Sequence, residues 1–170
     1  MLLQIETYRK EERKVNSTYQ PRKNLIIVID VFYALILLYL LFFKRVGLTH
    51  SETYAEFISI SYNFIPFKSV YVFLTTPVMS MRVILDFMVN FVGNIVLFIP
   101  WGILQPISFK KMQSFKCFII LTLIALVLVE TIQLFTMLGS FDIEDVLLNM
   151  LGACTGFALN NLCNKRARRS

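Results

Sequence analysis

The sequence has few charged residues and few residues that bind soft metals. Only 16% of its 170 residues are charged, whereas about a quarter are charged in a typical soluble domain. It has a single histidine, His50, and its three cysteines show no Cys-x-x-Cys spacing. A zinc site of the Cys/His kind is therefore excluded. The sequence also lacks a nucleophile motif and a phosphate-binding loop.

Apolar residues dominate instead. They make up 56% of the chain, and the mean hydropathy is +0.65. Four apolar runs reach the roughly 20 residues that a helix needs to cross a bilayer core: Leu25 to Phe43, Ile84 to Leu104, Cys117 to Leu138 and Ile143 to Leu162. Because an open strand edge cannot face lipid, we predict an all-α integral membrane protein. It is a bundle of about four transmembrane helices, with an amphipathic outer connection, residues 44–83, between the first and the second.

The basic residues lie outside the apolar runs and indicate the orientation. Six precede the first run, three lie between the second and third runs, and four follow the fourth; the first connection holds the remaining four. The positive-inside rule then places both termini in the cytoplasm. We predict a basic cytoplasmic segment (1–24), a transmembrane domain (25–163) and a basic cytoplasmic tail (164–170). Membrane lipids are the expected partners, and no nucleic acid is expected.

All four runs contain polar residues, and those of the second, third and fourth runs define a candidate site. With a rise of 1.5 Å per residue, Asn94, Glu130 and Asn149 come at similar depths, about 10–15 Å from the outer face. Intramembrane ionisable residues usually face a bundle interior or a watery cavity. We therefore predict a polar pocket that opens to the exterior. Its lining residues are Asp86, Asn90, Asn94, Glu130, Gln133, Asp142, Asp145 and Asn149.

Structural interpretations compete with this pocket. Asp142 could cap the fourth helix, and Asp30 could interact favourably with the dipole of the first. The amides could join helices by hydrogen bonds, and Glu130 could be a neutral, hydrogen-bonded acid. The Gly152-x-x-x-Gly156 spacing predicts close approach of another helix backbone.

Three segments carry a family resemblance. They read NFVGNIVLFIPWG (90–102), ETIQLF (130–135) and DIEDVLLNMLGACTG (142–156), and Asn63, Pro66 and Phe67 match an upstream element. In this order and spacing they resemble the VanZ-like membrane proteins over about residues 25 to 160. The resemblance implies a bacterial cell-envelope protein of the cell membrane. The family is named for low-level resistance to the glycopeptide teicoplanin.

Three functions remain open. The first is a non-enzymatic envelope factor whose pocket binds a lipid-linked cell-wall precursor, a lipid head group, a glycopeptide or a partner protein. The second is an intramembrane enzyme acting on a lipid-linked substrate, with Glu130 as the candidate catalytic acid or base. Asp142 and Asp145 would then polarise the substrate or hold a divalent cation such as Mg²⁺. The third is a proton-coupled carrier with Glu130 as a relay. The missing catalytic motifs favour the first, without a cofactor.

The distribution of basic residues predicts the result of a topology assay. A reporter fused after residue 170 should report the cytoplasm, and a reporter inserted in the 139–141 turn should report the exterior. An exterior carboxyl terminus would refute the orientation.

Overall fold

Four long helices form the framework of the structure, a computed structural model that describes residues 24–42, 53–78 and 80–167. They are the N-terminal helix Asn24–Phe42, α4 Met81–Ser108, α5 Phe115–Phe135 and α6 Ile143–Ala167. All four are long and apolar enough to cross a membrane. The predicted all-α membrane fold is therefore confirmed.

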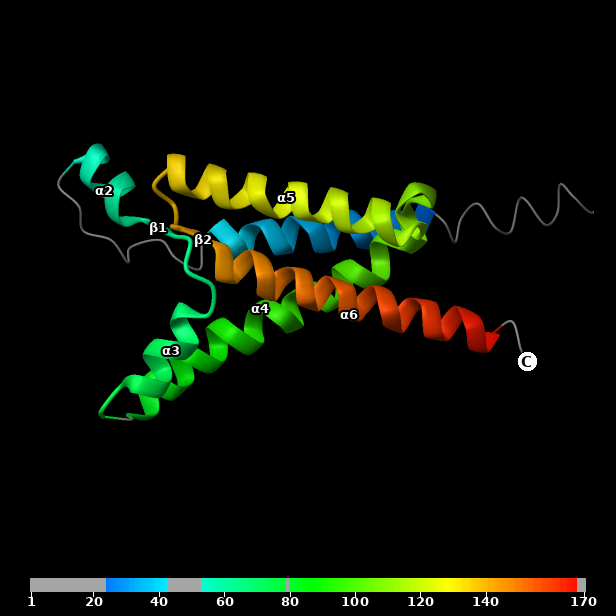
Figure 1. The fold of residues 1–170 in the computed structure, drawn as a ribbon. Helices are drawn as coiled ribbons and strands as arrows, with labels where there is room; N and C mark the ends of the chain where they lie inside the picture. The colour runs from blue at the N-terminus through cyan, green and yellow to red at the C-terminus, as the bar shows by residue number, and fades with distance from the viewer. Residues whose placement is uncertain (1–23, 43–52, 79, 168–170) are drawn as a thin grey trace, which may run out of the picture.

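Helix α4 is longer than its predicted span. It begins at Met81, where the Ser80 hydroxyl accepts a hydrogen bond from the Val83 N–H at 3.3 Å, and it continues through Pro100 and Pro106 to Ser108. At the helical rise per residue, its 28 residues extend about 42 Å, whereas a bilayer core is about 30 Å thick. In Figure 1, α4 accordingly runs at an angle to the other long helices.

Short elements gather at one end of the bundle. Within the first connection, the structure describes α2 Tyr54–Ile60, β1 Tyr62–Asn63 and α3 Lys68–Thr75. Strand β1 pairs in parallel with β2, Phe141–Asp142, which directly precedes α6. A 3₁₀ helix, Lys110–Gln113, joins α4 to α5 at the other end, near the carboxyl end of α6 (Figure 1).

Two predicted segments fall largely outside the described residues. They are the basic N-terminal segment and residues 43–52 of the first connection. The last three residues of the basic tail are also outside them.

Glycines bring the backbones of α4 and α6 into direct contact. A Cβ atom added at Gly152 or Gly156 would lie 2.0 Å from the carbonyl oxygen of Ile95 or Ile99, respectively. A Cβ atom on Gly102 of α4 would meet the Ala153 carbonyl oxygen at the same distance. The close approach predicted from the Gly152-x-x-x-Gly156 spacing is therefore confirmed, and its partner is α4.

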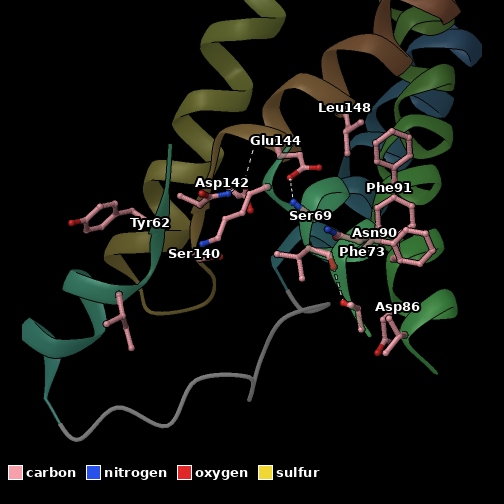
Figure 2. A pocket seen from close by; sticks show the side chains of 17 residues that line it. Tyr62, Ser69, Phe73, Asp86, Asn90, Phe91, Ser140, Asp142, Glu144 and Leu148 are labelled. Carbon is pink, nitrogen blue, oxygen red and sulfur yellow. Dashed lines mark hydrogen bonds between the residues drawn. The ribbon is translucent and has the colours of Figure 1, made fainter. Parts of the chain in front are cut away.

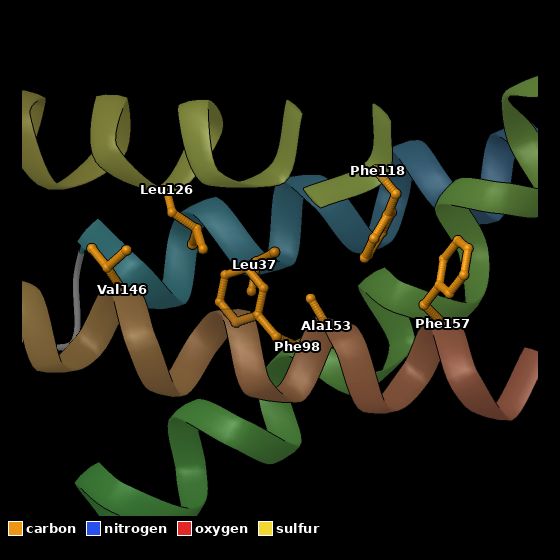
Figure 3. Close-up of a cluster of buried hydrophobic side chains, with 7 residues drawn as sticks. All are labelled: Leu37, Phe98, Phe118, Leu126, Val146, Ala153 and Phe157. Atoms are coloured by element: carbon orange, nitrogen blue, oxygen red, sulfur yellow. The ribbon is translucent and has the colours of Figure 1, made fainter. Parts of the chain in front are cut away.

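The apolar core lies where the four long helices meet. Each contributes at least one buried side chain to it (Figure 3): Leu37, Phe98, Phe118, Leu126, Val146, Ala153 and Phe157. Most large apolar side chains on the outer faces of these helices are exposed instead. Such a distribution suits helices whose outer faces contact lipid rather than water.

The glycine contact predicts a large difference in stability between two Gly→Ala variants. Gly152→Ala should lower the free energy of unfolding by about 3 kcal/mol, because a backbone carbonyl cannot move aside cheaply. Gly93→Ala is the matched control in α4, since nothing lies within 4 Å of the added Cβ atom. It should be neutral, or stabilising by up to about 1 kcal/mol through helix propensity. Thermal unfolding in detergent measures both, and equal stability of the two variants would contradict the contact.

Candidate functional site

A cavity of about 540 Å³ lies at the end of the bundle that carries β1 and β2. Its walls come from α3, the first half of α4, the two short strands and the start of α6. The polar part of the wall includes Asn63, Lys68, Ser69, Asp86, Asn90, Asp142 and Glu144. The apolar part includes Val72, Phe73, Val83, Phe87, Phe91 and Leu148. The cavity therefore offers both hydrogen-bonding groups and an apolar, partly aromatic surface (Figure 2).

Stacked aromatic rings hold α3 against α4 on one side of the cavity. The ring of Phe73 stacks on that of Phe87 with centroids 4.2 Å apart, and Phe87 stacks on Phe91 at 5.4 Å. Residues 87 and 91 are one helical turn apart, so their side chains share a face of α4. This stack fixes the apolar wall.

Asp142 is held in place by three hydrogen bonds. Its backbone N–H donates to Glu130 Oε2 at 3.1 Å. Its Oδ1 accepts from Asn63 Nδ2 at 3.2 Å and from the Glu144 N–H at 2.9 Å. The second of these is an N-terminal capping contact for α6, as the capping interpretation of Asp142 supposes. The carboxylate orientation is therefore fixed while Oδ2 stays available to a ligand.

Glu144 connects two helix N-termini. It lies in the first turn of α6, and its Oε2 accepts a hydrogen bond from the Ser69 N–H, in the first turn of α3, at 3.0 Å. Both helix dipoles favour a negative charge at this point. The side chain is only 1% exposed, and its Oε1 has no hydrogen-bond partner among the described residues. A buried acceptor without a donor is costly, so this oxygen is suited to a ligand donor.

A buried polar layer lies between α4 and α6, next to residues of the cavity wall in the sequence. Asn94 Nδ2 donates to Asp145 Oδ1 at 2.7 Å, and both residues are buried. Asn149, one turn further along α6, is 1% exposed, and its Oδ1 finds no partner in the described part of the chain. The Asn94–Asp145 bond joins α4 to α6.

Glu130 and Gln133 tie the carboxyl-terminal end of α5 to its surroundings. Glu130 is 3% exposed and holds the Asp142 backbone. Gln133 Nε2 donates to the Leu41 carbonyl oxygen at 2.8 Å, and its backbone oxygen accepts from the N–H groups of Leu138 and Gly139. Gln133 therefore joins the N-terminal helix to α5 and closes the turn that leads to β2.

The predicted site residues thus fall into two groups. Asp86, Asn90 and Asp142 line the cavity. Asn94, Glu130, Gln133, Asp145 and Asn149 are buried and do not belong to its wall.

Several residues on the polar wall were absent from the predicted site, among them Asn63, Lys68, Ser69 and Glu144. The upstream family element contains Asn63, and Glu144 lies between two predicted site residues, so these two carried a signal. Lys68 and Ser69 follow Phe67, whose φ of 60° is left-handed, and no sequence pattern marks them.

The carboxyl groups do not converge on a single point. In the described ranges, no group of three or more His, Cys, Asp and Glu side chains is placed to hold a metal ion. Asp86 lies on α4, whereas Asp142 and Glu144 lie at the start of α6, across the cavity (Figure 2). This spread suits a ligand with several polar groups.

The four spanning helices and the polar end of the bundle define a multi-pass membrane protein. A family model described as VanZ/LLP1 matches residues 30–164. The chain therefore belongs to the VanZ/LLP1 family.

One relative is "Protein VanZ" from Enterococcus faecium. It is 34% identical over 74 residues, which cover 44% of this chain and 45% of that protein. The match thus spans less than half the length of this curated relative. No solved structure matches the chain.

The Glu130 contact predicts an order of stability between two variants. Glu130→Gln keeps an oxygen that can accept from the Asp142 N–H. Glu130→Leu leaves that N–H unpaired, at a cost of about 1–3 kcal/mol. The Leu variant should therefore unfold at a lower temperature than the Gln variant in detergent. A Leu variant as stable as the Gln variant would show that the contact contributes nothing.

Proposed function

We propose that this protein is a cell-envelope factor of the bacterial cell membrane that binds the polar head of an amphiphilic envelope molecule. The cavity opens to the exterior, and both termini lie in the cytoplasm. By holding such a molecule, a lipid-linked precursor or lipid, the protein lowers the effect of the glycopeptide teicoplanin on the cell.

This proposal rests on the cavity wall having both a polar part and an apolar part. Carboxylates, amides and an ammonium group line one part, and stacked phenylalanines line the other. A volume of about 540 Å³ lies within the usual range of small-molecule sites. A head group would meet the polar part while its apolar portion contacts the aromatic part.

The positions of the basic residues support the orientation. Lys110, Lys111 and Lys116 lie in or near the 3₁₀ helix, and Lys165 and Arg166 lie in the last turn of α6. Both regions are at the end of the bundle opposite β1 and β2 (Figure 1), whose residues line the cavity. By the positive-inside rule, this distribution supports a cytoplasmic location for that end and an outer location for the cavity.

The enzymatic alternative is less well supported. A general acid or base must reach the group whose proton it transfers. Glu130 Oε2 is bonded to the Asp142 N–H instead, and Glu130 is not part of the cavity wall. A loss of phenotype in a stable Glu130→Gln variant would favour this alternative nonetheless.

Filling the cavity should abolish the protection against teicoplanin that the protein gives to the cell. Asn90→Trp places a large side chain in the cavity, so teicoplanin susceptibility should rise to the level of cells without the protein. Val89→Trp is the matched control, because Val89 is the preceding residue of α4, is 56% exposed and does not line the cavity. It should retain the phenotype.

Susceptibility is measured alongside the amount of protein in the membrane. An Asn90→Trp variant of normal abundance with a full phenotype would refute the proposal.

A further inference from the structure

The cavity carries an excess of carboxyl groups. Asp86, Asp142 and Glu144 line it, and Lys68 is the basic residue of its wall. Among the described residues of the wall, three acidic groups against one basic group give a formal charge of −2. A ligand bound here is more stable if it contributes positive charge.

Two observations identify the kind of positive charge. Glu144 Oε1 is buried and unpaired, and Glu144 lines the cavity. Asp142 Oδ2 has no partner in the described residues, and the bonds to Oδ1 hold the carboxylate in one orientation. Both oxygens are acceptors, so the matching group is one that donates hydrogen bonds. A primary ammonium group has three N–H donors, whereas a quaternary ammonium has none.

Lys68 supplies a positive charge that can pair with a negatively charged group of the ligand. Its side chain is exposed at the start of α3 and makes no ion pair with a described residue. An ammonium group on a flexible stem suits a phosphate oxygen. The wall therefore offers acceptors for an ammonium group and a cation for a phosphate group.

The apolar wall indicates that the ligand is attached to a lipid. Val72, on α3, lines the cavity and is 51% exposed, and Ile60, at the end of α2, also lines it and is 63% exposed. The apolar wall thus includes side chains that are exposed at the surface and suited to contact with hydrocarbon. A head group in the cavity could extend its acyl chains along these side chains.

We propose that the cavity holds the head group of a phospholipid with a primary ammonium group. Asp142 and Glu144 accept hydrogen bonds from the ammonium group, and Lys68 pairs with the phosphate. The inference rests on the proposed function and names the class of amphiphile that the cavity binds.

The first test needs no variant. Native mass spectrometry of the purified full chain measures binding of dioleoylphosphatidylethanolamine, its mono- and dimethyl derivatives and dioleoylphosphatidylcholine. Affinity should fall at each methylation, with about a tenfold total loss, since charge-assisted hydrogen bonds are removed. Equal affinity for all four lipids would overturn the ammonium assignment.

Variants test the residues separately. Asp142→Asn and Glu144→Gln keep the oxygens that accept from the Glu144 and Ser69 N–H groups but replace the free acceptor by a donor. Each should weaken phosphatidylethanolamine binding about tenfold and leave phosphatidylcholine binding unchanged. Lys68→Gln should weaken both lipids alike. Glu56→Gln is the control, because Glu56 is exposed on α2 and outside the cavity. Folded Asp142→Asn and Glu144→Gln variants with unchanged lipid preference would refute their role.

Two further measurements distinguish failure of this inference from failure of the proposed function. If soluble O-phosphoethanolamine displaces the lipid at equal concentration, the lipid assignment falls and ammonium recognition stands. If Asn90→Trp weakens all lipids but the wild type shows no head-group preference, only this inference fails. If Asn90→Trp changes binding of no lipid, the proposed function fails as well.

Discussion

The arrangement of the polar end depends on the contact between two helix backbones. Gly102, Gly152 and Gly156 allow α4 and α6 to touch, and side chains at these positions would hold them apart. The contact sets the register that places Asn94 opposite Asp145. Since α4 crosses at an angle, its first half diverges from α6 (Figure 1). The cavity occupies the space that α3 and the strands partly enclose.

Burial of the carboxyl groups requires local compensation. In a low-dielectric interior an isolated charge is very costly, and the chain provides a partner in each case. Asp30 accepts from Gln105 Nε2 at 2.8 Å, Asp145 from Asn94, and Glu144 from a helix N-terminus. These bonds connect segments far apart in the sequence, so each buried acid also fixes the position of an element. Among the described residues, the buried acceptors without a partner include Glu144 Oε1, whose residue lines the cavity, and Asn149 Oδ1, one turn further along α6.

Hydropathy was sufficient to predict the four spanning helices, because each of them is an apolar run of several helical turns. The depth argument identified residues that are buried at the same end of the bundle, among them Asn94 and Asn149. It could not separate the cavity wall from the buried polar layer, since depth along a helix says nothing of rotation about its axis. The helix-dipole interpretation of Asp30 likewise gave no hint of Gln105. The Ser69–Glu144 contact depends on how residues 53–78 fold back, and these residues carry too few periodic positions to predict it.

The pairing of β1 with β2 affects the order in which parts of the protein unfold. Among the described residues, few hydrogen bonds join α2 and β1 to the bundle, for example Phe141 N–H to the Ser61 oxygen and Asn63 Nδ2 to Asp142 Oδ1. The spanning helices, in contrast, share the buried core. Segments with few tertiary bonds open at a lower free energy than the whole protein unfolds. We therefore expect α2 and β1 to unfold as a separate cooperative unit. Their amide protons should exchange with solvent while those of the long helices remain protected.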